Sequence, residues 1–129
     1  MKWQNPADRL DDDRTYDLLV SRGLDDWLQP ADFFDLARFS APSSETEYRR
    51  LAVDLASRLI YRGHARPGDV AEGRHQPWSG SPDDQLGRVA ELWLDTGVDA
   101  RFAFVWFDLT ESGRSFAEDA FRRTTAEHD

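Results

Sequence analysis

The sequence contains no cysteine, and Lys2 is its only lysine. Without cysteine the chain has no disulfide bonds, no thiolate nucleophile and no zinc site built from sulfur ligands. It also lacks any apolar stretch of the roughly 20 residues that a membrane-spanning helix needs. Its first residues lack the apolar stretch of a signal peptide. We therefore expect no membrane span and a cytoplasmic location.

The sequence also lacks the short motifs that mark common catalytic sites. It has no H-E-x-x-H, phosphate-binding loop, dinucleotide fingerprint or G-x-S-x-G elbow. His128 lies in the tail, while His64 and His75 occupy a turn-rich segment where loop-bracing or surface roles are favoured over catalysis. Adjacent acids such as Asp83 and Asp84 diverge by about 100° on a helix, which makes them poor partners for acid–base chemistry. We expect neither an enzyme nor a cofactor-binding protein.

Negative charge is abundant and lies near the start of the chain. The formal net charge is −9, which disfavours non-specific binding to nucleic acid or anionic lipid. Residues 11–35 contain eight carboxylates against two arginines, and Trp27 lies among them. An aromatic residue ringed by charge is typical of a protein-recognition hot spot. The predicted partner-binding residues are Asp11, Asp12, Asp13, Asp25, Asp26, Trp27, Asp32 and Asp35. The simpler alternative for residues 11–13 is a helix cap preceded by solvated acids.

Apolar periodicity and capping residues predict five helices. They cover residues 13–22, 30–39, 45–62, 82–95 and 111–123. The third has the clearest signal, because Ser44 and Glu47 form a capping box and apolar residues such as Leu55 and Leu59 recur at steps of three and four. The fourth begins with a cap followed by Pro82 in its first position.

The longest apolar run, residues 102–107, predicts a strand over 102–108. Because the residues that point to either side of this strand are apolar, we expect the strand to be covered on both faces. Trp106 is then expected in the core beside Trp78 and Trp93. A further short strand is predicted near Pro67 and Gly68. The predicted fold is a single α+β domain over residues 1–129, mostly α, with five helices around a two- or three-stranded sheet. Residues 1–12 are an irregular lead-in and residues 124–129 a frayed tail.

The end of the predicted strand carries a short resemblance to a known family. Residues 109–114 read LTESGR, and a strand that runs through LT-x-x-G-R into a helix resembles the segment after the wing in winged-helix regulators of the multiple-antibiotic-resistance type. The resemblance implies a winged-helix-like fold whose helix–turn–helix is formed by residues 30–39 and 45–62. The positions that match its DNA-reading helix are Ser44, Glu45, Thr46, Glu47, Arg49 and Arg50. Carboxylates in that leading turn would face phosphate or base edges, which is unfavourable.

Two functions are compatible with these patterns. Small, acidic, cysteine-free bacterial proteins of this kind are similar in character to immunity proteins, which neutralise a cognate toxin by covering its active region. We therefore predict a non-enzymatic acidic protein-binding module, such as an immunity or inhibitor protein, that binds a basic protein partner and neither nucleic acid nor membrane. The alternative is a winged-helix DNA-binding transcriptional regulator.

Overall fold

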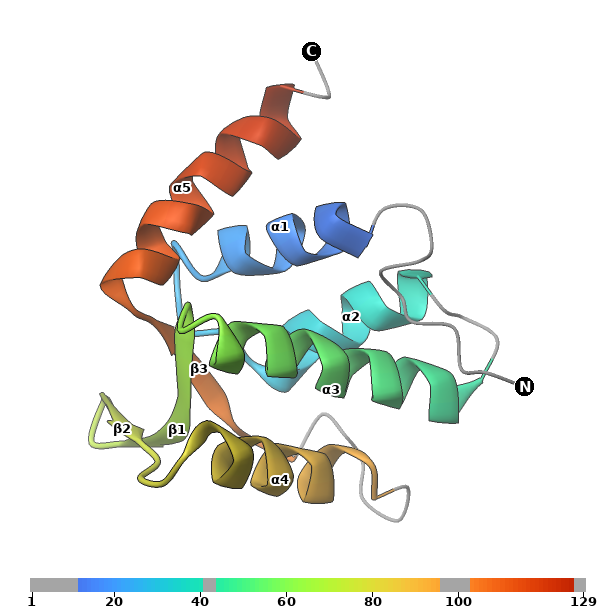
Figure 1. The fold of residues 1–129 in the computed structure, drawn as a ribbon, viewed down its shortest axis with the longest axis vertical. Helices are drawn as coiled ribbons and strands as arrows, with labels where there is room; N and C mark the ends of the chain where they lie inside the picture. Colours follow the sequence, from blue (N-terminus) through green and yellow to red (C-terminus); the bar gives the residue numbers. More distant parts are fainter. Residues whose placement is uncertain (1–11, 41–43, 96–102, 127–129) are drawn as a thin grey trace.

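The computed structural model describes residues 12–40, 44–95 and 103–126, which form five helices and a three-stranded antiparallel sheet (Figure 1). The elements in chain order are α1 (Asp12–Arg22), α2 (Pro30–Ser40), α3 (Glu45–Tyr61), β1 (Ala65–Ala71), β2 (Arg74–Pro77), α4 (Pro82–Trp93), β3 (Trp106–Leu109) and α5 (Glu111–Ala126). The predicted class, α+β and mostly α, is confirmed. Within the described ranges, no helix has the length and apolar character of a membrane span.

Local capping sets the starts of α3 and α4. The Ser44 hydroxyl accepts a hydrogen bond from the Glu47 amide at the first turn of α3. At α4, the side chains of Ser81 and Asp84 each accept from the other residue's amide, and Pro82 occupies the first turn. These contacts satisfy amides that have no partner inside the helix. The two helices end at Tyr61 and Trp93, one and two residues before their predicted ends.

The sheet has the strand order β2-β1-β3. Gly68 of β1 lies opposite Pro77 of β2 on one side and Trp106 of β3 on the other, so a strand near Pro67 and Gly68 is confirmed. On the far side of β3, Leu28 forms an isolated antiparallel bridge with Phe107, and each amide donates to the other's carbonyl at 2.9 Å. The connection between α1 and α2 is therefore bound to the edge of the sheet.

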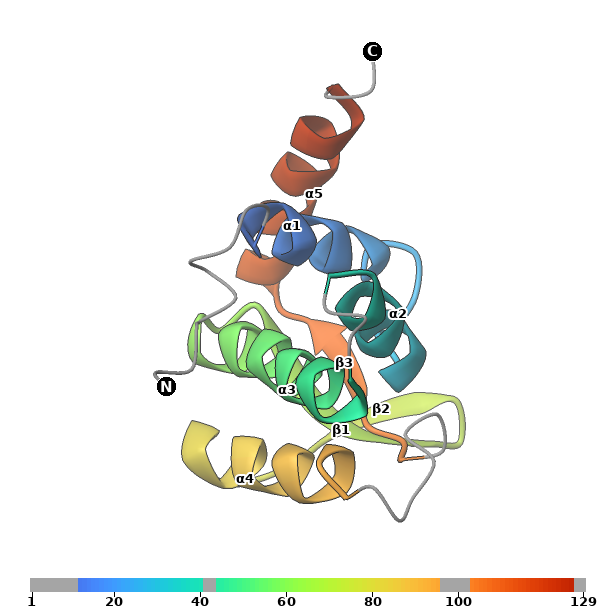
Figure 2. The same ribbon diagram turned by 90° about the vertical axis from the view of Figure 1, so that its right-hand side faces the viewer.

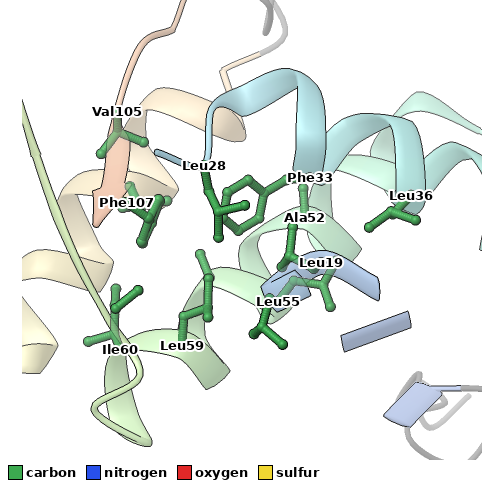
Figure 3. Close-up of a cluster of buried hydrophobic side chains, with 14 of the residues drawn as sticks. Leu19, Leu28, Phe33, Leu36, Ala52, Leu55, Leu59, Ile60, Val105 and Phe107 are labelled. Atoms are coloured by element: carbon green, nitrogen blue, oxygen red, sulfur yellow. The ribbon is translucent and has the colours of Figure 1, made fainter. Parts of the chain in front are cut away.

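The hydrophobic core is formed by the sheet and all five helices, with Ala117 and Ala120 contributed by α5, and Figure 3 shows part of it. Leu59 points from α3 toward Leu28 and Phe107, whereas Leu55 lies beside Leu19 of α1, and all five side chains are fully buried. The ring of Phe33 lies 5.0 Å from that of Phe107 and 4.8 Å from that of Trp93. The predicted core positions of Trp78 and Trp93 are confirmed, and the Trp93 indole donates to the Ala103 carbonyl at 3.1 Å.

The expectation that the apolar run is covered on both faces was wrong. The regular strand begins only at Trp106, and residue 102 lies outside the described residues. From residue 103 the side chains alternate: Ala103, Val105, Phe107 and Leu109 are buried, whereas Phe104 is 42% exposed and Trp106 is partly exposed. The reason is that α2, α3 and α4 all lie on one side of the sheet (Figures 1 and 2).

The LT-x-x-G-R segment has a structural explanation of its own. The Thr110 hydroxyl donates to the Gly63 carbonyl at 2.6 Å and accepts from the Gly113 amide at 3.0 Å, so it caps α5 and ties it to the end of α3. A Cβ atom at Gly113 would lie 1.7 Å from the main-chain oxygen of His64. Glycine is therefore required because α5 starts in direct contact with the backbone before β1.

The predicted C-terminal end needs correction. Helix α5 continues to Ala126, three residues beyond its predicted end, so the frayed tail does not begin at residue 124. Thr124 is only 6% exposed, and its hydroxyl donates to the Ala120 carbonyl at 3.0 Å, which holds the last turn in the helix. Helix α1 begins at Asp12, the last residue of the expected lead-in, and residues 1–11 lie outside the described residues.

Candidate partner-binding surface

The structure does not bring the predicted acidic residues together on one face. Asp11 lies outside the described residues, and Asp12 is the first residue of α1. Asp13 is exposed in the first turn of α1, whereas Asp25 and Asp26 are exposed after its last turn. A helix of this length spans about 15 Å, so the two groups of acids lie at opposite ends of α1.

Two acids of the same region have structural roles instead. Asp32 accepts a hydrogen bond from the Gln29 amide at 2.8 Å at the start of α2, and Arg22 lies 3.5 Å from the same carboxylate. Asp17 is 9% exposed, and both of its oxygens accept from Arg123 of α5, at 2.9 and 3.1 Å. Part of the negative charge of this region is therefore paired within the protein, where it holds α1 and α2 in place. Asp35 remains exposed on α2.

The residues that do lie together are Asp25, Asp26 and Trp27. The Asp26 carboxylate accepts a hydrogen bond from the Trp27 amide at 2.7 Å through one oxygen. Leu28 points into the core beside Phe107, and side chains alternate along an extended chain, so Trp27 lies on the opposite, outer side of the sheet. Its ring is partly exposed and lies 6.2 Å from the ring of His75.

His75 reaches the same place from the other edge of the sheet. Its ring crosses β1 at Gly68, and Nε2 donates to the main-chain oxygen of Trp106 at 2.8 Å. A Cβ atom at Gly68 would lie 2.8 Å from Cε1 of His75 and 2.3 Å from the Gln76 oxygen. The missing side chain at Gly68 therefore makes the space through which His75 spans three strands.

Phe104 and Trp106 complete the outer surface. Their rings stack almost in parallel, with an interplanar angle of 7° and centres 5.1 Å apart. Together with Trp27 and His75 they form what we call the aromatic face. In the described part of the chain no helix lies against this side of the sheet (Figure 1). Sequence reasoning placed Trp106 in the core because the pairing of β3 with β1 joins distant segments and leaves no local signal. It placed His75 in a loop, although the two-residue turn at Glu72 and Gly73 between β1 and β2 is a local hairpin signal.

Carboxylates lie at the Trp27 end of the aromatic face. Asp25 and Asp26 are exposed next to Trp27. Asp108 lies on the same side of β3 as Trp106, and the antiparallel bridge of Leu28 with Phe107 places it opposite Trp27. Arg66 lies opposite Asp108 in β1. This rim thus holds three acids and one described arginine, which makes the potential there negative.

A second feature is a hollow of about 410 Å³ between α1, α5 and the end of α3, lined in part by Tyr16, Arg62 and Phe116. The Tyr16 hydroxyl lies 2.7 Å from His64 Nδ1, and the His64 ring stacks on Phe116. Burial raises the pKa of Tyr16 to about 12. Burial, followed by the charge of Arg62, lowers the pKa of His64. Both groups are therefore neutral at neutral pH, and His64 braces α1 against α5.

The residues that match a DNA-reading helix are largely engaged within the protein. Arg49 is 3% exposed, pairs with Glu45 at 2.8 Å, and donates to the main-chain oxygens of Trp93 and Asp95 at 2.8 and 3.1 Å. The Ser44 hydroxyl caps α3. These contacts arise because α4 packs along α3. Of the matched positions, Arg50 is the basic residue that remains exposed.

Among the described residues, no group of three or more histidines and carboxylates is placed to hold a metal ion. No protein-family model, curated protein sequence or solved structure matches the chain.

Proposed function

We propose that the protein is a non-enzymatic, cytoplasmic protein-binding module whose partner is basic and docks on the aromatic face. The observation that carries the proposal is the position of Trp27 and Trp106 on the side of the sheet that no described helix covers, with Asp25 and Asp26 beside Trp27. Aromatic residues are enriched at interface hot spots, where a rim of polar and charged groups surrounds them. Both rings lie outside the core, which buries Trp78 and Trp93.

Charge supports a basic partner. The net charge of −9 attracts cationic proteins over long range, and the carboxylates at the Trp27 end of the aromatic face orient the encounter. In size and charge the protein is similar to immunity proteins, so a toxin is the partner that fits this proposal best.

The alternative is a winged-helix transcriptional regulator. The feature in its favour is that α2 and α3 are consecutive packed helices followed directly by β1, with LT-x-x-G-R after β3. Against it, Arg49 is buried and bonded inside the protein, and Glu47 is exposed in the leading turn of α3. A phosphate backbone would meet little positive charge there.

The test is parallel capture of proteins from lysate of the source organism with four immobilised forms: wild type, Trp27→Ala, a double variant (Asp25→Asn and Asp26→Asn) and a control double variant (Glu91→Gln and Glu118→Gln). The control removes the same charge from exposed positions on α4 and α5. We expect one basic protein to be retained by the wild type and the control and lost with both site variants. Equal retention by all four forms would contradict the proposal.

Binding kinetics with the captured partner then separate the two contributions. The double asparagine variant should associate more slowly and with a flatter salt dependence, because long-range attraction acts on association. Trp27→Ala should mainly speed dissociation, because a buried contact is lost only after the complex has formed.

A further inference from the structure

This inference rests on the proposed function and concerns the residue that the partner places on the aromatic face. We infer that this residue is an arginine, whose guanidinium lies over the ring of Trp27 and bonds the carboxylates of Asp25 or Asp26. A lysine ammonium would be attracted by the same carboxylates, but it lacks the flat face that stacks on the ring and the fixed fork of N–H donors.

The protein itself stacks arginine on aromatic rings repeatedly. Among the described residues, four guanidinium groups lie over rings, measured from the guanidinium carbon to the ring centre: Arg38 over Tyr48 at 4.9 Å, Arg62 over Tyr16 at 4.7 Å, Arg88 over Trp78 at 3.9 Å and Arg123 over Phe116 at 5.3 Å. Within the described ranges no guanidinium lies over Trp27, although the residue is partly exposed, follows Asp25 and Asp26, and lies opposite Asp108. Trp27 is therefore a partly exposed ring beside carboxylates over which no described arginine is stacked.

The carboxylates are placed to bind the same group. Asp26 uses one oxygen for the Trp27 amide, which fixes the side chain and leaves its second oxygen for a partner. Asp25 is exposed one residue earlier, and Asp108 lies opposite Trp27 in the sheet. A side chain that is already held loses less conformational freedom on binding.

Only a planar guanidinium can use both features at once. It can stack on a ring through its face while the N–H groups along its edge donate to the second oxygen of Asp26 or to both oxygens of Asp25. An ammonium is a compact, strongly hydrated charge that lacks this flat fork. Arg66 of β1, which pairs with Asp108 of β3, repels a second cation on that side of Trp27. The partner's arginine is therefore directed toward Trp27 and the acids before it.

The probe is a pair of synthetic peptides of equal length and charge, alternating glycine with arginine in one and glycine with lysine in the other. Dissociation constants are measured by titration calorimetry at low and physiological salt. We expect the arginine peptide to bind about fivefold tighter or more, the size expected of a stacked cation with a paired carboxylate. This preference should disappear in Trp27→Ala and in the Asp25→Asn, Asp26→Asn double variant, and persist in the Glu91→Gln, Glu118→Gln control.

Trp27→Leu is a second variant that keeps apolar volume but removes the ring, so it separates loss of stacking from loss of packing. Near-UV circular dichroism and the unfolding midpoint establish that each variant is folded. If both peptides bind equally and Trp27→Ala weakens both, the arginine inference is wrong while the proposed function stands. In a separate outcome, the arginine peptide could still bind more tightly than the lysine peptide to Trp27→Leu. The inference that arginine stacks on the ring of Trp27 would then be wrong. If neither peptide's binding depends on the site variants, the docking surface itself is refuted, and the proposed function falls with it.

Discussion

His75 donates a hydrogen bond from Nε2 to the main-chain oxygen of Trp106 over 2.8 Å, and its ring crosses the intervening strand at Gly68. This contact joins β2 to β3, two strands that are not neighbours in the sheet. It also holds one side of the aromatic face in place.

Replacing Gly68 with alanine should therefore destabilise the protein. The added Cβ would lie 2.3 Å from the Gln76 oxygen, so strand β2 and His75 must move, at a cost of about 1–3 kcal/mol in free energy of unfolding. Gly87→Ala is the matched control, because no atom lies within 4 Å of the added Cβ on α4 and alanine favours a helix by about 0.5–1 kcal/mol. Urea unfolding of both variants measures the difference. A Gly68→Ala protein as stable as the wild type would contradict the close approach.

Leu55 lies at the centre of the core, so its truncation should be among the most costly changes. Leu55→Ala should lower the free energy of unfolding by about 2–5 kcal/mol, since the side chain is fully buried in the core beside Leu19. Phe121→Ala, at a 54% exposed position on α5, should change it by no more than about 0.5 kcal/mol. Denaturant midpoints of the two variants make the comparison.

Tyr16 should make stability fall at alkaline pH. Burial raises its pKa from 10.0 to about 12 in the folded protein. Below pH 10 the phenol is protonated in both states and its stabilising contribution is complete. As the pH rises from 10 through about 12, the unfolded chain loses its proton first, so the contribution is lost. Urea unfolding across this range should show a steeper decline for wild type than for Tyr16→Phe. A native Tyr16 that ionises near pH 10, seen by phenolate absorbance, would contradict this.

His64 should act at the other end of the pH range. Burial, followed by the charge of Arg62, lowers its pKa below the usual 6.5, so the folded state favours the neutral ring. Its contribution to stability is therefore complete above pH 6.5 and is lost as the pH falls below that value, where the unfolded chain takes up a proton first. The unfolding midpoint of wild type should fall more between pH 7 and pH 5 than that of His64→Gln. Equal changes in the two proteins would be evidence against this role.

The protein should not bind duplex DNA in the sub-micromolar range at physiological salt. The net charge is −9, and Arg49 is bonded to Glu45 and to two main-chain oxygens in the protein interior. Gel-shift assays with random and operator-like duplexes at two salt concentrations measure this. A salt-sensitive shift with a defined sequence preference would favour the regulator instead.

Sequence alone was sufficient for features whose causes lie within a few residues. The start of α3 follows from Ser44 and Glu47, and its buried side from the spacing of Leu55 and Leu59. The start of α4 follows in the same way from Ser81 and Pro82. Capping and apolar periodicity act over one or two helical turns, so the residues that decide these elements are adjacent in the chain.

Tertiary structure decided which acids and aromatics are available to a partner. Asp17 is neutralised by Arg123, which is 106 residues away, and no local pattern indicates that pair. The run that contains Trp106 has apolar residues on both sides of the strand, so its sequence does not show which side faces the core. That choice was made when β3 paired with β1 and Leu28 and the helices packed against one side of the sheet, because only then do distant side chains meet or remain uncovered.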